Sequence, residues 1–182
     1  MPHDRLAFPM PAPCEVVFDV FHYHQWRARW DSLVSHTSVD GGAPCPHVGA
    51  VSANTGGGFL RALSMRTEFV SYQRPRLAAA RMLGTSFPFS KWAASMKHES
   101  AAGGGSVLIY TYTIEAGPPL LRWLIEPVVH HIFRRQTFKR FERMRVFLAA
   151  HAGEVQAWQR SYHGAGAGYS SDSSASNDIP PA

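Results

Sequence analysis

The sequence predicts one α+β domain in which a curved antiparallel sheet is covered by a long C-terminal helix. Two observations predict this fold class. Six strand-like runs follow one another in the middle of the chain, separated by short turns rich in glycine or proline. A long stretch with helical periodicity then follows them. Strands with such short connections pair as an antiparallel meander, and that sheet needs a large amphipathic element over its buried face.

The N-terminal part of the chain is expected to contribute one strand and two short helices. Alternating apolar residues predict a strand over residues 5–10, which the following prolines end. Apolar residues at helical spacing predict a helix over residues 14–23. A second short helix over residues 25–31 would present Trp26 and Trp30 on one face, because they lie four positions apart.

The sheet and the long helix account for most of the remaining chain. The central strands are expected at residues 33–39, 48–54, 59–72, 77–83, 89–99 and 107–114. A helix is predicted over residues 118–150, with Pro127 interrupting it in its first third. One helix over a curved sheet leaves a cavity between them unless large side chains fill it.

The composition sets the domain organisation and excludes several classes of protein. The ordered domain is expected to span residues 1–151, followed by a short helical extension over residues 152–163. Residues 164–182 are small and polar without periodicity, which is typical of a disordered tail. A hydrophobic content of 45% excludes a wholly disordered protein, and two cysteines exclude a disulfide scaffold. No apolar run reaches the length of a membrane span or of a secretory signal.

Cysteine and histidine spacing gives no metal site. Cys14 and Cys45 lack the paired spacing of a zinc or redox motif, so we expect two reduced thiols in a cytoplasmic protein. His22 and His24 would point about 200° apart on a helix. No neighbouring residues complete a set of metal ligands with them.

The net charge of +5 comes from one segment of the predicted helix. Residues 134–145 contain six basic residues and one acidic residue, which alone equals that charge. Four of the basic residues are expected on the face opposite the apolar stripe: Arg135, Lys139, Arg140 and Arg143. Such a face is either a solvated surface or a weak contact for an acidic partner or membrane surface. It lacks interleaved aromatic residues, so no specific nucleic-acid binding is expected.

Several short segments, together with the order of elements, form a characteristic pattern: 12–19 (APCEVVFD), 30–31 (WD), 48–49 (VG), 68–70 (EFV), 74–77 (RPRL), 104–107 (GGSV) and 141–144 (FERM). This pattern resembles the START-like superfamily, also called SRPBCC or Bet v 1-like helix-grip domains. Over residues 5–150 it looks most like the bacterial polyketide cyclase/dehydrase-type members. The resemblance implies a helix-grip fold and a cavity for a hydrophobic ligand. Its members include lipid and sterol carriers, hormone receptors and aromatic-polyketide cyclases, and they share no single catalytic motif, so no catalytic residue is carried over.

Strand alternation identifies side chains that face the cavity. In residues 107–114 the even positions include Tyr110 and Tyr112, and in residues 89–99 they include Trp92 and Met96. Aromatic groups with one polar tip suit a pocket for an apolar ligand that carries a few oxygens. The same side chains could instead simply complete the core.

The long helix adds further candidates to these. One stripe holds Thr137, Phe138, Phe141, Met144 and Leu148. Projected backwards, this stripe has Arg134 near its centre and His130 and His131 on its margins. The Arg134 guanidinium would either bind a carboxylate or phosphate in the cavity or extend into water. One histidine would either act as a general base or be a satisfied or exposed side chain. The predicted ligand-binding residues are Trp92, Met96, Tyr110, Tyr112, His130, His131, Arg134 and Phe138.

Three functions are consistent with these features. The first is a carrier or sequestering module that binds a lipid-like, polyketide or aromatic molecule and uses no cofactor. The second is a cyclase or dehydratase in which a cavity histidine and a tyrosine act as acid and base. It requires one histidine, Arg134 and a tyrosine to converge inside an enclosed pocket. The third is binding of nucleic acid or an anionic membrane through the basic surface.

Overall fold

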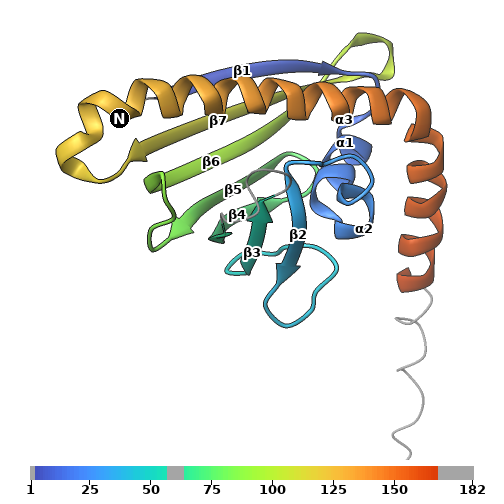
Figure 1. Cartoon of the computed structure of the whole chain (residues 1–182). Coiled ribbons are helices and arrows are strands. Elements are labelled where there is room, and N and C mark those ends of the chain that lie inside the picture. Colours follow the sequence, from blue (N-terminus) through green and yellow to red (C-terminus); the bar gives the residue numbers. More distant parts are fainter. Residues whose placement is uncertain (1–2, 57–63, 168–182) are drawn as a thin grey trace, which may run out of the picture.

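The computed structural model describes residues 3–56 and 64–167, and it shows one seven-stranded antiparallel sheet with helices on one side (Figure 1). The strands are β1 (His3–Met10), β2 (Val34–Val39), β3 (Val51–Gly56), β4 (Ser64–Gln73), β5 (Leu77–Leu83), β6 (Phe89–Ser100) and β7 (Ser106–Ala116). The helices are α1 (Cys14–His22), α2 (His24–Arg27) and α3 (Arg122–Ala167), with short 3-10 helices η2 (Ala102–Gly104) and η3 (Pro119–Leu121).

The sheet has the strand order β1-β7-β6-β5-β4-β3-β2. Strands β2 to β7 form the antiparallel meander that the glycine and proline turns predict. Strand β1 pairs with β7 at the opposite edge, because α1 and α2 carry the chain from there to β2. The predicted fold class, a helix-grip sheet with two short helices after the first strand, is therefore confirmed. Residues 59–63 of the predicted third strand lie outside the described residues.

The second short helix is shorter than predicted. Helix α2 ends at Arg27, and the following residues form turns rather than a helix to Asp31. Both Trp26 and Trp30 are nevertheless buried, as expected for one apolar face. The indole Nε1 of Trp30 donates a hydrogen bond to the carbonyl oxygen of Val20 at 3.1 Å, which ties this turn to α1.

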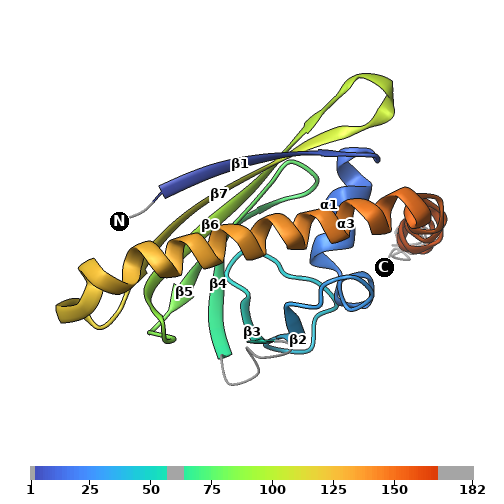
Figure 2. The ribbon, with the colours of Figure 1, turned by 45° about the horizontal axis from the view of Figure 1, so that its top comes forward.

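Helix α3 crosses in front of the sheet (Figure 2), and its main contacts with the sheet are made to β7 and β1. Thr137, Phe141, Met144 and Leu148 are buried, which confirms most of the predicted apolar stripe. Phe138 departs from it because it lies at the outer flank and is 42% exposed.

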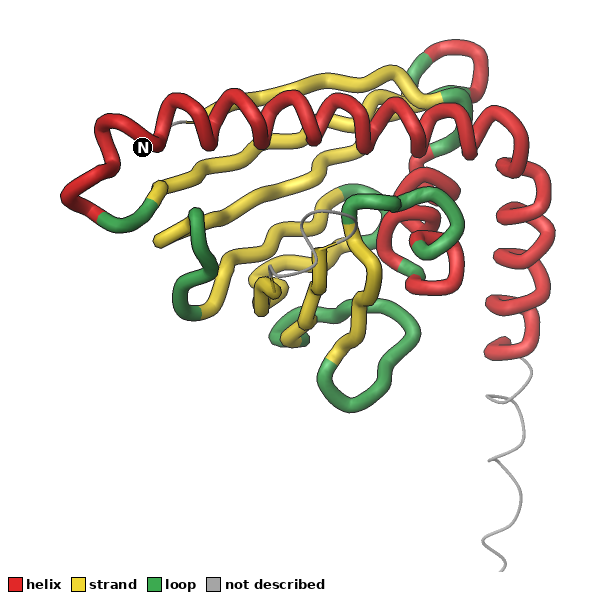
Figure 3. The backbone as a smooth tube through the Cα atoms, viewed as in Figure 1, coloured by secondary structure: helices red, strands yellow, loops and turns green. Residues whose placement is uncertain are grey.

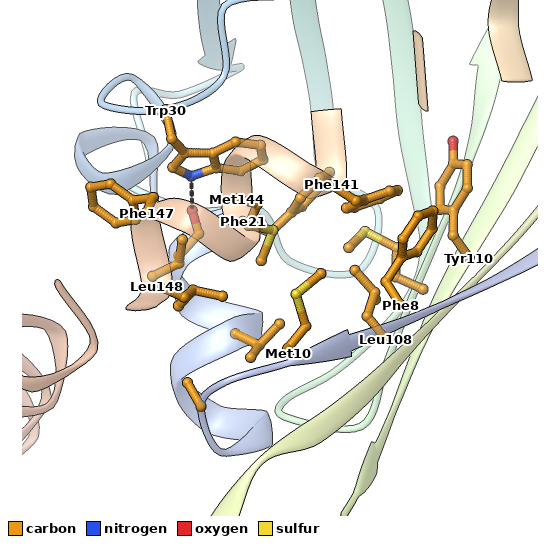
Figure 4. Close-up of a cluster of buried hydrophobic side chains, with 14 of the residues drawn as sticks. Phe8, Met10, Phe21, Trp30, Leu108, Tyr110, Phe141, Met144, Phe147 and Leu148 are labelled. Atoms are coloured by element: carbon orange, nitrogen blue, oxygen red, sulfur yellow. Dashed lines mark hydrogen bonds between the residues drawn. The ribbon is translucent and has the colours of Figure 1, made fainter. Parts of the chain in front are cut away.

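The hydrophobic core is concentrated where α1, β1, β7 and α3 meet (Figure 4). The labelled side chains of this cluster are Phe8, Met10, Phe21, Trp30, Leu108, Tyr110, Phe141, Met144, Phe147 and Leu148. Burial of this many large apolar side chains holds α3 rigidly against the sheet edge.

The C-terminal part of α3 changes direction and runs beside α1 and α2 (Figure 3). Residues 152–163, expected as a short helical extension, belong to the same helix, which continues to Ala167. Residues 168–182 of the expected tail lie outside the described residues. We call residues 152–162 the C-terminal arm. Its Val155 is fully buried, and its Trp158 ring lies 4.7 Å from that of Tyr23. None of the helices described here has the length and apolar character needed to cross a membrane.

Candidate functional site

A cavity of about 410 Å³ lies between α3 and the face of β3 to β7. Its floor is formed by the sheet, one wall by a flank of α3, and one end by α1 and α2. The opposite end is formed by the turn between β5 and β6, where Phe87 is 72% exposed, and by Val129 of α3. Volumes of this size accommodate small organic ligands.

Small side chains on neighbouring strands create this space. Ala78 and Ala80 of β5 and Ala94 of β6 all line the cavity, and Ala80 and Ala94 are direct cross-strand partners. Alternation along a strand points residues 78 and 80 to the same face. Three alanines in the middle of the floor therefore leave open a volume that larger side chains would occupy. Apolar and aromatic groups, such as Phe69 and Phe133, surround them.

The polar groups on the β3–β4 side of the floor satisfy one another. The hydroxyls of Ser52 and Thr67 lie 2.9 Å apart. The side-chain amide of Asn54 donates to Ser52 Oγ at 3.2 Å and accepts from the hydroxyl of Thr37 at 3.1 Å. A ligand gains little by contacting groups that are already paired, so this side acts as a largely neutral surface.

A charged group closes the end of the cavity near α1 and α2. Arg27 and Arg140 both line the cavity, and both donate to the carboxylate of Asp31. The Nε atom of Arg27 lies 2.9 Å from Asp31 Oδ2, and Nη2 of Arg140 lies 2.5 Å from the same oxygen. The Asp31 side chain is 1% exposed. Both guanidinium carbons also lie about 5 Å from the ring centre of Phe21.

The electrostatics of this group reflect two cations on one anion. Burial raises the pKa of Asp31, but the attraction of Arg140 and Arg27 outweighs it and holds that pKa below its usual value. Burial and repulsion by Arg140 lower the pKa of Arg27 to about 10, despite the attraction of Asp31. Two guanidinium groups and one ionised carboxylate give this group a net charge of +1.

Three further polar side chains face the cavity without charge at neutral pH. Burial raises the pKa of Tyr110 to about 12, so its phenol stays protonated. Burial lowers the pKa of His22 to about 3, and its Nδ1–H donates to the carbonyl oxygen of Phe18 at 2.8 Å. The indole Nε1 of Trp92 is buried and has no hydrogen-bond partner among the described residues. Tyr110 and Trp92 are thus donors available to a ligand.

The structure places only some of the predicted site residues at the cavity. Trp92, Met96 and Tyr110 line it, as strand alternation predicts. Tyr112 also points to the helix side of the sheet, but it is 1% exposed and packs beneath α3 against Phe133. It therefore belongs to the packed layer under the helix and is not among the lining residues.

The helix candidates lie on the β1 side of α3, away from the cavity. Arg134 is half exposed, and its Nε donates to Asp4 Oδ2 at 2.8 Å. The hydroxyl of Tyr112 lies 3.4 Å from the same carboxylate and 3.2 Å from His130 Nε2. The edge of Phe138 meets Phe8 of β1. A histidine, Arg134 and a tyrosine thus converge, but around Asp4 and outside the cavity.

The position of α3 on the sheet explains why its predicted site residues lie away from the cavity. His131 is exposed to solvent, and positions 134 and 136 differ by about 200° around the helix axis. Because α3 lies over β7 and β1, its apolar stripe meets the sheet, and the cavity lies at the flank that carries Gln136 and Arg140. Helical periodicity in the sequence identifies the apolar stripe of α3. It does not identify which flank of the helix faces the cavity.

Arg140 also corrects the predicted basic face. Its side chain is 17% exposed and pairs with Asp31, so it does not lie on the outer surface. The other three residues, Arg135, Lys139 and Arg143, are exposed as predicted, and Arg143 donates to Ser32. Sequence reasoning missed the charged group because Arg140 lies far along the chain from its partners. The spacing of Arg27 and Asp31, four residues apart beside two tryptophans, is the signal that could have indicated a buried pair.

Several solved structures share this fold at low sequence identity. TTHA0849 from Thermus thermophilus is 16% identical, with a TM-score of 0.65 over 82% of this chain and 99% of that chain. Ara h 8.0201 is 12% identical, with a TM-score of 0.62 over 82% of this chain and 98% of that chain. DynU16, from the dynemicin biosynthetic locus, is 14% identical, with a TM-score of 0.59 over 81% of this chain and 47% of that chain.

The sequence itself matches a protein family over most of its length. A comparison with curated proteins gave no match. Residues 6–146 match the family described as polyketide cyclase/dehydrase and lipid transport, and this range includes the sheet except for the first residues of β1, together with the cavity-lining part of α3. The chain therefore belongs to the polyketide cyclase/dehydrase and lipid transport family.

Proposed function

We propose that the protein binds a hydrophobic small molecule in the cavity between the sheet and α3 and acts as a carrier or sequestering module. One observation carries this proposal: about 410 Å³ of space lined mainly by apolar and aromatic side chains, with few unpaired polar groups. Enclosing an apolar ligand there removes its surface from water, at about 25 cal/mol per Å² buried. Membership of a family that includes lipid transport in its description supports it.

The alternative function, a cyclase or dehydratase, needs an acid and a base beside the bound substrate. The Tyr112–His130 pair has the required contact, but it lies on the other flank of α3. The histidine that does line the cavity, His22, has a pKa of about 3 and is a weak base. The cavity geometry therefore favours binding over acid–base catalysis.

The carrier proposal includes a cytoplasmic location. Cys14 and Cys45 are both free thiols in the structure. Free cysteines are typical of a reducing compartment. The exposed basic residues Arg135, Lys139 and Arg143 then remain candidates for a weak contact with an acidic partner or a membrane surface.

Native mass spectrometry of freshly purified protein tests the proposal. We expect a bound small molecule in the wild type and in Ala93→Phe, which adds a ring on the exposed face of β6. Ala94→Phe places the same ring inside the cavity and should abolish the bound mass while the protein stays folded. A wild type that carries no small molecule, and whose Tm is unchanged by a panel of lipids and aromatic compounds, would overturn the proposal.

A further inference from the structure

We propose that the cavity selects a ligand with one carboxylate group, held by Arg27 and Arg140 at the α1–α2 end. This inference rests on the proposed function and names the ligand class. The apolar part of such an amphiphile would lie over the alanine floor formed by Ala78, Ala80 and Ala94.

The net charge at this end of the cavity favours a monoanionic ligand group. Two guanidinium groups and one carboxylate leave one positive charge uncompensated at the wall of an apolar cavity. An unbalanced charge is costly in such surroundings, and a bound anion removes that cost. One excess charge matches a carboxylate. A phosphate monoester carries a charge of −1.5 to −2 at neutral pH, so its binding would leave the site with a net negative charge.

The two arginines also have hydrogen-bond donors that Asp31 does not use. Arg27 uses Nε towards Asp31, and Arg140 uses Nε and Nη2. No described residue accepts a hydrogen bond from Nη1 or Nη2 of Arg27 or from Nη1 of Arg140. Guanidinium groups bind carboxylates through paired N–H donors, so these free donors suit a second carboxylate beside that of Asp31.

The two guanidinium groups are held in place before a ligand binds. Asp31 holds both guanidinium groups by ion pairs, and the ring of Phe21 lies about 5 Å from each. Tyr110 stands nearby as a neutral hydroxyl donor that lines the same cavity. A ligand carboxylate therefore meets donors that are already positioned, and it does not have to order flexible surface chains. Asp31 acts as a positioning residue in this arrangement.

The test compares three ligands that share one apolar chain: dodecanoate, dodecan-1-ol and dodecyl phosphate. Isothermal titration calorimetry on the wild type should show dodecanoate binding about tenfold tighter, or more, than the alcohol, as one charge-assisted hydrogen bond predicts. Dodecanoate should also bind more tightly than dodecyl phosphate. Equal affinity for acid and alcohol would overturn the inference and leave the proposed function intact. Tighter binding of the phosphate would assign the site to that headgroup instead.

Substitutions locate the selectivity within the molecule. In Arg140→Gln the preference for dodecanoate over dodecan-1-ol should fall close to one, while the affinity for the alcohol is retained. Arg135→Gln removes an exposed arginine from the same helix and should keep the full preference. Arg27→Gln provides a second variant in case Arg140→Gln does not fold. Undiminished preference in a folded Arg140→Gln or Arg27→Gln protein would contradict the assignment, whereas failure of the wild type to bind any of the three ligands would contradict the proposed function itself.

Discussion

Two interior histidines, His22 and His98, are uncharged at neutral pH because of their burial. Burial lowers the pKa of His22 to about 3 and that of His98 to about 4. In His98 neither ring nitrogen has a hydrogen-bond partner among the described residues. Protonation of either ring would place a charge against aromatic neighbours such as Phe18.

These histidines predict a loss of stability in mild acid. Histidine in an unfolded chain titrates near pH 6.5, so below that value the unfolded state binds more protons than the folded state. The free energy of unfolding therefore has its full value above pH 6.5 and decreases as the pH falls towards 4. Replacing His98 with leucine should remove about 2–3 kcal/mol of the loss between pH 6.5 and pH 4.5. Urea unfolding of the wild type and of His98→Leu at these two pH values measures the difference. If the free energy of unfolding changes with pH equally in both proteins, the burial of His98 does not cause the loss.

The ion pair between Asp4 and Arg134 makes a different prediction because it lies outside the cavity. Asp4 links β1 to α3 through Arg134 and also accepts from Tyr112. Because Arg134 is half exposed, Asp4→Asn should cost no more than about 1 kcal/mol of stability. Ligand occupancy in native mass spectrometry should remain that of the wild type. A folded Asp4→Asn protein that loses its ligand would show that this cluster takes part in binding.

At the scale of the elements, the C-terminal arm is part of the folded core. Gln159 donates to Asp19 Oδ2 at 2.6 Å, and Asp19 is held in turn by both Nε and Nη2 of Arg74. Trp158 packs against Tyr23 and Trp26. The arm therefore fastens α3 to α1 and α2, which form one end of the cavity.

Trp158→Ala tests this role of the arm. Loss of the indole should lower the free energy of unfolding by about 3 kcal/mol, because it leaves space between α3 and the two short helices. Arg160→Ala, an exposed substitution two residues further on, should change it by less than about 0.5 kcal/mol. Equal effects of the two substitutions in chemical denaturation would show that the arm contributes nothing specific to the core.

Some features of the helices and strands follow from the sequence alone, and others do not. Turns rich in glycine and proline determine where strands end, so the meander and the inward direction of Trp92, Met96 and Tyr110 were predictable. Helical periodicity likewise predicted the buried stripe of α3. The position of α3 across the sheet depends on packing between distant segments. Arg134 was therefore expected near the cavity, and Arg140 was expected on the outer face.

At the scale of the whole molecule, the cavity follows from two independent features. The large side chains that join α3 to the sheet are gathered over β1 and β7, whereas β5 and β6 contribute the alanines Ala78, Ala80 and Ala94 to the cavity floor. The fold thus separates a tightly packed half, which supplies stability, from an open half, which supplies space. We propose that this open half binds a hydrophobic molecule.

The indole N–H signals of the five tryptophans report directly on binding in this half. Trp92 lines the cavity with a buried Nε1 that has no hydrogen-bond partner among the described residues, whereas Trp123 is 77% exposed on α3. Titration of ¹⁵N-labelled protein with anilinonaphthalene sulfonate, with Trp92→Phe to assign the signal, should shift the Trp92 resonance saturably in the wild type and not in Ala94→Phe. A Trp92 resonance that stays unmoved in the wild type at saturating probe would contradict the account.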